Sequence, residues 1–175
     1  YYFYMSWNVK YVALILLTTA VSYGTALLME GTESRKKKKC YMAAALVISL
    51  GVLFFFKYFN FLSNSVTDVL EKFSIPVHRV TLDLLLPVGI SFYTFQTLSY
   101  VIDVYRGEEK ACRHFGKYAT FIAFFPQLVA GPIERTRNLL PQIEREHRFD
   151  CEKALYGAKV IAWGFFKKVA IADTI

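Results

Sequence analysis

Cysteine and histidine are scarce in this sequence, and neither stands at the spacing of a metal site. The cysteines are Cys40, Cys112 and Cys151, and the histidines are His78, His114 and His147. An odd number of cysteines without a CxxC pair predicts free thiols in a reducing compartment. The histidines have no cysteine or histidine partner at ligand spacing. These absences argue against a disulfide framework and against a metal centre.

The motifs of common soluble enzymes are missing too. There is no glycine-rich phosphate loop, no HExxH and no GxSxG, and the apolar runs hold no paired carboxylates for a proton relay. No signal peptide is recognisable, and the chain begins at Tyr1 instead of a methionine. Because Ile175 follows directly on an apolar run, we expect a segment of a longer protein.

Apolar residues are abundant by contrast. They make up 55% of the 175 residues and 17% are aromatic, yet 21 lysines and arginines against 14 acidic residues give a net charge of +7. A soluble domain this apolar would have to hide too much surface for its size. Disordered chains are poor in aromatic residues, and the charge of a nucleic-acid binder would not explain the uninterrupted apolar stretches. The composition therefore predicts an all-α, polytopic membrane protein with basic loops.

Three apolar runs have the length of membrane-spanning helices, at residues 11–29, 40–62 and 84–102. The first would form a helix roughly 28 Å long, close to the thickness of the hydrocarbon layer. Residues 63–83 repeat apolar side chains at helical spacing, which predicts a short amphipathic helix on the outer membrane surface. Lys57 lies near the end of the second run, and two interpretations stay open. Its amine either reaches the headgroups or faces a polar cavity.

The charged loops indicate the orientation of these runs. The loops at residues 30–39 and 103–117 are rich in lysine and arginine, so the positive-inside rule places both in the cytoplasm. The next run, residues 119–133, is short for a span and is interrupted by a proline in its middle and a Gly-Pro pair at its end. A complete crossing would put the basic residues that follow it outside, so we expect a re-entrant or broken helix surrounded by protein. The last run, residues 154–175, either spans the membrane or lies at its surface.

Polar side chains form a stripe along the third run. Tyr93, Gln96, Tyr100 and Asp103 follow the spacing i, i+3, i+7 and i+10, which places them on one face of a helix. A helix facing lipid would not carry such a face, because unsatisfied polar groups in hydrocarbon are costly. The face therefore either hydrogen-bonds to other helices or lines a substrate path. Asp103 stands at the end of the stripe, where a surface ion pair with Arg106 is expected.

Four blocks of this sequence resemble the amino-terminal half of the membrane-bound O-acyltransferase family. They are FFKYFNF (Phe55 to Phe61), LPVGISFYTFQTLSYVIDVYRG (Leu86 to Gly107), FFPQLVAGPIERTRNLLPQ (Phe124 to Gln142) and GFFKKVAIAD (Gly164 to Asp173). Each block is modest by itself, but the four stand in the family's order over residues 55–173. The sequence is most similar to the branch of the alginate O-acetylation acyltransferases and more distantly similar to the D-alanyl transferases of teichoic acid.

The resemblance implies a fold and a reaction. The fold is a ring of tilted and broken helices, and this chain would form part of it. The reaction is transfer of an acyl group, acetyl in the alginate branch, to hydroxyls of an extracytoplasmic polysaccharide. The lipid bilayer and accessory acetylation proteins are the implied partners, with no role for nucleic acid. No permanently bound cofactor is implied, and the acyl donor stays open between acyl-CoA and an acyl carrier protein.

The resemblance also implies functional residues. The family's catalytic residue is a membrane-embedded histidine in the later half, which acts as a general base on the acceptor hydroxyl. No histidine here matches its motif, so we expect this segment not to catalyse alone. The candidates for the wall and floor of a cavity are Tyr93, Gln96, Tyr100, Asp103, Pro126, Gln127, Gly131, Pro132 and Arg135. Lys57, Lys167 and Lys168 are candidates for binding headgroups or donor phosphates. Helix packing and interfacial anchoring are the alternative roles for all of them.

A transporter or channel is the competing functional class, because broken helices, polar stripes and basic loops occur there too. A transporter should carry an internal repeat of such segments, and this sequence has none. A purely structural membrane subunit is the third class, but it would not need a buried polar face.

Overall fold

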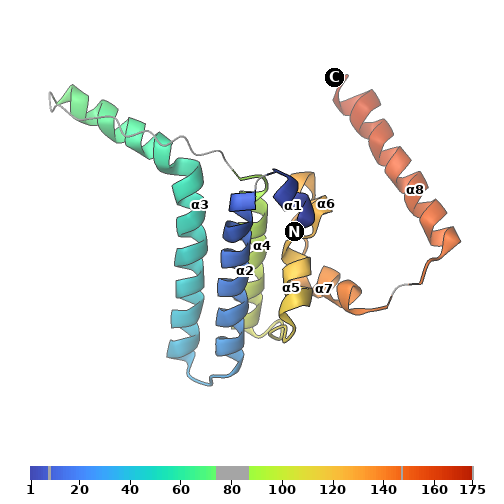
Figure 1. Ribbon diagram of the computed structural model, residues 1–175, viewed down its shortest axis with the longest axis horizontal. Helices are drawn as coiled ribbons and strands as arrows, with labels where there is room; N and C mark the ends of the chain where they lie inside the picture. The colour runs from blue at the N-terminus through green and yellow to red at the C-terminus, as the bar shows by residue number, and fades with distance from the viewer. Residues whose placement is uncertain (8, 74–86, 147, 175) are drawn as a thin grey trace. The chain divides into compact units, whose positions relative to one another are not determined.

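The computed structural model describes residues 1–7, 9–73, 87–146 and 148–174 (Figure 1). These residues form helices and connecting segments without any strand, which confirms the predicted all-α class. The contacts divide the chain into two units, residues 1–144 and 145–175, and each is described by itself. The helices of the first unit are α1 (Tyr2–Trp7), α2 (Val9–Glu30), α3 (Arg35–Lys72), α4 (Ile90–Arg106), α5 (Phe115–Ile122), α6 (Phe125–Ala130) and α7 (Thr136–Glu144).

The helices α2 and α3 contain the two segments of the described chain that are long and apolar enough to cross a membrane, Tyr11–Glu30 and Arg35–Lys72. The helix α3 includes the predicted run 40–62 and continues without a break through residues 63–72. The separate amphipathic helix predicted for 63–83 is therefore wrong for its first part, and residues 74–83 lie outside the described residues. In Figure 1 the later part of α3 turns away from the axis of its first part.

The helix α4 is bounded by two glycines in the left-handed region. Gly89 precedes it with a φ of 71° and Gly107 follows it with a φ of 77°. Backbone N–H groups after the helix close its end, since Gly107 donates to the carbonyl of Val104 at 3.1 Å and Glu108 to that of Asp103 at 2.9 Å. With 17 residues α4 is about 26 Å long, near the lower limit for a membrane-spanning helix.

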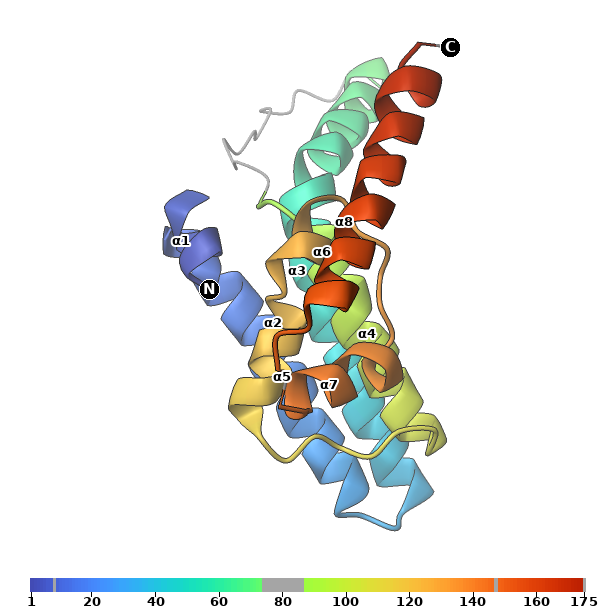
Figure 2. The ribbon, with the colours of Figure 1, turned by 90° about the vertical axis from the view of Figure 1, so that its right-hand side faces the viewer.

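The helices α5, α6 and α7 form a broken segment beside α2 and α4 (Figures 1 and 2). The break falls at Ala123 and Phe124, and Pro126 stands in the first turn of α6, where a missing N–H costs no helical hydrogen bond. The helix α7 then packs against α5, and its Glu144 lies 3.7 Å from the amine of Lys117. The segment therefore begins and ends at the same end of the unit.

The core of the first unit lies where α2, α3, α4 and α5 meet. Its largest fully buried side chains include Tyr93, Tyr100, Tyr118 and Phe121. The outer side of α3 is apolar and open, with Val47 and Phe61 each 71% exposed. An apolar surface of this extent on a folded helix needs a lipid or protein partner. The first unit is thus an all-α membrane protein segment with a polar-aromatic interior.

The second unit is a single helical arm. It contains α8 (Cys151–Phe166) and a π-helical continuation, η1 (Lys167–Ala172), with no buried residue in either. The Asp150 side chain caps α8 by accepting from the backbone N–H groups of Glu152 at 3.1 Å and Lys153 at 3.2 Å. The apolar side chains of this arm are exposed on all sides, as expected for a helix that is covered by lipid or by other protein.

Candidate functional site

The predicted polar stripe of α4 lies on the inner side of the helix. Tyr93 and Tyr100 are fully buried, Gln96 is 3% exposed and Asp103 is 9% exposed. The helices α2, α3, α5 and α6 all contact α4, so the stripe faces protein and not lipid. The 3.6-residue period places these four side chains one above the other along the interior.

Gln96 stands at the centre of the site, because it joins α4 to the broken segment. Its amide nitrogen donates to the carbonyl of Phe121 at 3.2 Å and to Oε1 of Gln127 at 3.2 Å. Phe121 lies in the last turn of α5, where the carbonyls have no partner in the next helical turn. Gln96 thus donates a hydrogen bond to a backbone carbonyl that the end of α5 leaves without a helical partner. Two sets of predicted residues meet at the hydrogen bond to Gln127. They are the α4 stripe and the sequence block from Phe124 to Gln142, called here the GPI block after its residues Gly131, Pro132 and Ile133.

Tyr100 is part of a network that ties the loop after α4 to α2. Its hydroxyl accepts from the backbone N–H of Cys112 at 2.8 Å, and its ring centroid lies 4.5 Å from that of Tyr118. Tyr118 in turn donates to Oγ of Ser22 at 2.8 Å. The role that these contacts support for Tyr100 is helix packing, one of the two interpretations that the sequence left open.

Asp103 does not form the expected pair with Arg106. The Arg106 guanidinium lies 3.8 Å from Glu108 instead, and both side chains are exposed. The carbonyl of Asp103 accepts from the N–H groups of Glu108 at 2.9 Å and Glu109 at 3.3 Å, so this residue anchors the turn after the helix. The expected ion pair is wrong because the turn at Gly107 brings Glu108 back toward Arg106.

Tyr93 is the member of the stripe with an open hydrogen-bonding group. Its ring packs edge-on against Tyr4 at a centroid distance of 6.4 Å, and Tyr4 donates its own hydroxyl to the carbonyl of Val88 at 2.9 Å. The buried hydroxyl of Tyr93 makes no well-formed hydrogen bond among the described residues, and it lies near the Tyr4 hydroxyl, which already donates to Val88. A buried hydroxyl without a partner is costly, so Tyr93 is the best-placed group of the stripe to donate to a ligand or a water.

The residues predicted from the GPI block divide into two groups. Gln127 is half-buried against Gln96, and Gly131 packs so closely on it that an added Cβ would lie 2.8 Å from the Gln127 Cα. Pro126, Pro132 and Arg135 are exposed. The structure therefore brings Gln127 to the α4 stripe, packs Gly131 on the backbone of Gln127, and leaves the other three at the surface of the first unit.

The three lysines predicted to bind headgroups or donor phosphates contact their own neighbours. The Lys57 amine lies 3.5 Å from the Ser91 hydroxyl in the first turn of α4 and 5.6 Å from the centroid of the Tyr58 ring. Lys167 lies 5.6 Å from the centroid of the Trp163 ring, and Lys168 forms an ion pair with Asp173. The last two belong to the second unit.

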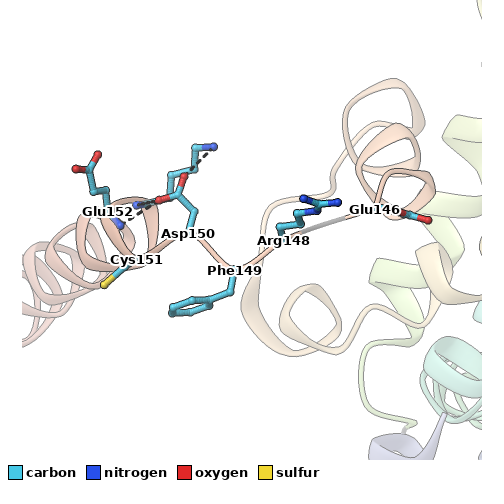
Figure 3. A pocket seen from close by; sticks show the side chains of 7 residues that line it. Glu146, Arg148, Phe149, Asp150, Cys151 and Glu152 are labelled. Atoms are coloured by element: carbon cyan, nitrogen blue, oxygen red, sulfur yellow. Dashed lines mark hydrogen bonds and ion pairs between the residues drawn. The ribbon is translucent and has the colours of Figure 1, made fainter.

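The hollow lined by Glu146 and by residues 148–153 is large but open. It has a volume of about 790 Å³, and Figure 3 shows its side chains spread along one extended segment and the start of α8. The backbone N–H of Lys153, followed by its amine, lowers the pKa of the Asp150 carboxyl below its ordinary value. The two backbone contacts of Asp150 cap α8, and the other lining side chains spread along the segment without converging on one point (Figure 3). No group of three metal-ligating side chains gathers in the described part of the chain.

The sequence analysis missed three residues that shape the site. An added Cβ on Gly89 would lie 2.5 Å from the Leu128 carbonyl, so this glycine lets α6 approach α4. Tyr118 carries the hydrogen bond to α2, and the His114 ring accepts from the N–H of Lys117 at 3.3 Å as the cap of α5. Only Gly89 left a local signal, a glycine directly before a helix. The other two histidines lie outside the described residues.

Comparison with known proteins gives homologues over the whole chain. A probable alginate O-acetylase AlgI of Azotobacter vinelandii is 38% identical over all of this chain and 35% of its own length. The same protein of Pseudomonas aeruginosa is 38% identical over all of this chain and 34% of its own length. A peptidoglycan O-acetyltransferase of Helicobacter pylori is 31% identical over 98% of this chain and 37% of its own length.

The chain spans about a third of the length of the curated relatives it matches. No protein-family model and no solved structure matches it. The resemblance seen in four sequence blocks is confirmed, because the similarity to the named acetylases extends over every residue of the chain. The chain therefore belongs to the membrane-bound O-acyltransferase family, on the branch of the alginate O-acetylases.

Proposed function

We propose that the full-length protein transfers an acetyl or other acyl group to hydroxyls of an extracytoplasmic polysaccharide. The proposal is supported by relatives named alginate O-acetylase and peptidoglycan O-acetyltransferase, which match this chain from end to end. None of these relatives is named as a transporter or a channel, so that competing class has no support from them.

One structural observation supports the proposal most strongly, the bridge that Gln96 makes to Phe121 and Gln127. Broken backbone at membrane depth is tolerated where protein or a cavity surrounds it. Gln96 surrounds part of this broken backbone with protein, because its side chain hydrogen-bonds to it. The same bonds hold the polar face of α4 against the broken segment. The result is a preformed polar interior, which an acyltransferase needs in order to bring a hydroxyl to an acyl carbon inside a membrane.

The reaction itself requires a base and a polar pocket. The acceptor hydroxyl oxygen attacks the acyl carbon and a new ester C–O bond forms. A base takes the hydroxyl proton, the bond between the acyl carbon and the donor breaks, and the base returns the proton to the departing donor group. In our proposal that base is the family histidine in the remainder of the protein. The role of this chain is to hold the interior in place, with the open hydroxyl of Tyr93 available to an oxygen of the acceptor or of the acyl group.

The same proposal includes a multi-pass orientation. The turn at residues 31–34 and the loop at 107–114 lie at one end of the first unit (Figure 1). They are held there by contacts of Arg113, whose guanidinium lies 3.9 Å from Glu30 and whose carbonyl accepts from the Tyr23 hydroxyl at 2.9 Å. By the positive-inside rule this end is cytoplasmic. The segment from α5 to α7 starts and finishes at that end, which favours a re-entrant path over a crossing.

The proposal extends to the donor and the partners. We propose that an acyl thioester, acyl-CoA or an acyl carrier protein, reaches the protein from the cytoplasmic end, and that accessory acetylation proteins act with it on the outer side. The lysines Lys57, Lys167 and Lys168 remain candidates for headgroups or donor phosphates. Lys168 would first have to give up its ion pair with Asp173.

The experiment that tests the role of the site compares two neighbouring variants of the full-length protein. Gln96→Ala removes both hydrogen bonds to the broken segment, whereas Thr97→Ala removes a buried hydroxyl that bonds only within α4, to the Thr94 carbonyl at 2.8 Å. We expect Gln96→Ala to lower acyl transfer per folded molecule and Thr97→Ala to leave it near the wild-type rate. An equal loss of activity and folded yield in Gln96→Ala would mean that Gln96 acts only in helix packing.

A further inference from the structure

A second hollow lies between the first turn of α3 and the last turn of α4, away from the Gln96 bridge. Its volume is about 420 Å³, and it is lined by Glu33, Arg35, Lys38, Tyr105 and Arg106. Because α3 and α4 pack against each other, helices far apart in the sequence build one concave surface. Of its lining residues only Arg106 has a contact described above, with Glu108, and none of them takes part in the Gln96 bridge.

The hollow carries an excess of positive charge. Three cations face one carboxylate, and Arg35 and Lys38 form no ion pair within the described part of the chain. Arg106 contacts Glu108 at 3.8 Å, with its side chain 62% exposed. A contact of this length between exposed groups is weak, so Arg106 is available to a stronger anion.

The surroundings of the hollow make this charge unfavourable in the absence of an anion. Residues 35–39 place five cations in the first turns of α3, at the positive end of its dipole, where cations are destabilising. The side chain of Ser34 makes no cap hydrogen bond that would offset them. A helix start of this kind is stabilised when a negative group binds beside it.

We propose that this hollow binds the phosphate group of an anionic ligand. Arg35 and Arg106 offer planar guanidinium donors from two different helices, and Lys38 adds a point charge to the same lining. The phosphate has two possible sources, the headgroup of an anionic lipid or the phosphate ester of a soluble molecule. The chemistry of recognition is the same for both, and the inference does not depend on acyl transfer.

The test uses the purified full-length protein in a neutral detergent. Thermal unfolding is followed while dioctanoyl phosphatidylglycerol, coenzyme A or zwitterionic dioctanoyl phosphatidylcholine is added. The variants are Arg35→Gln with Lys38→Gln, and Arg106→Gln. The matched control is Lys37→Gln with Lys39→Gln, which removes the same charge from the same helix outside the hollow. Each midpoint without ligand reports whether a variant still folds.

We expect an anionic probe to raise the unfolding midpoint of the wild-type protein, and its half-saturating concentration to rise about fivefold for each lining cation removed. A response to phosphatidylglycerol alone identifies a lipid headgroup, and a response to coenzyme A alone identifies a soluble phosphate ester. The control variant should respond like the wild type. An equal loss in the control would mean diffuse charge attraction, and equal responses to phosphatidylcholine and phosphatidylglycerol, or no response at all, would also overturn the proposal.

Discussion

The contact between Gly89 and Leu128 gives the sharpest prediction about how the site is assembled. Replacing Gly89 by alanine places a Cβ 2.5 Å from the Leu128 carbonyl oxygen, in a residue whose φ is +71°. Gly107 offers a matched control, since its φ is +77° and an added Cβ meets nothing within 4 Å. Both substitutions bring left-handed strain of about 1–2 kcal/mol. Only Gly89→Ala forces α6 away from α4, which adds about 1–3 kcal/mol.

The assay for this pair is unfolding of the full-length protein in detergent together with acyl transfer per folded molecule. We expect Gly107→Ala to lose only the smaller increment of stability and to keep its activity. Gly89→Ala should lose the larger increment, and its activity should fall further than its folded yield because the backbone at Gln127 moves with Leu128. If the two variants lose the same stability and the same activity, the close approach of α4 and α6 does not position the site.

Two further predictions concern single hydrogen bonds and a charge. Tyr118→Phe removes the buried 2.8 Å bond to Ser22 and should cost about 1 kcal/mol of unfolding free energy. Tyr23→Phe should cost less, because its 2.9 Å bond to the Arg113 carbonyl is exposed. Denaturant unfolding measures both, and a larger cost for Tyr23→Phe would contradict the greater weight given to the buried bond. Asp150 should titrate below the ordinary aspartate pKa, because the N–H groups at the start of α8 hold its ionised form. Its stabilisation of α8 is therefore complete above the pKa of an unfolded aspartate and is lost as the pH falls through the lower folded value. Carboxyl titration by NMR checks this, and an ordinary or raised pKa would contradict it.

The local pattern of the sequence predicted which face of α4 is polar but not what that face contacts. The spacing of Tyr93, Gln96 and Tyr100 follows from helix geometry alone, and all three are buried. The partner of Gln96 is a carbonyl in α5 that becomes free only because that helix ends. Such a pairing depends on tertiary packing, for which the sequence of either segment carries no local signal.

The errors at helix ends have the same origin. Residues 63–72 have the apolar spacing of a helix, and nothing local distinguishes a new surface helix from a continuation of α3. The ion pair predicted for Asp103 and Arg106 has the right spacing on a helix, but the turn at Gly107 places Glu108 closer to Arg106. In the second place the neighbouring turn decided which carboxylate Arg106 contacts.

The most direct test of the account is whether the full-length protein makes an ester. Purified protein would be placed in phospholipid vesicles with a labelled acetyl thioester and a polysaccharide acceptor, and base-labile acetyl groups on the polysaccharide would be measured. The account predicts ester-linked acetyl that requires the protein and falls in the Gln96→Ala variant. Movement of acetate or polysaccharide across the vesicle without any ester would contradict it and would favour a transporter.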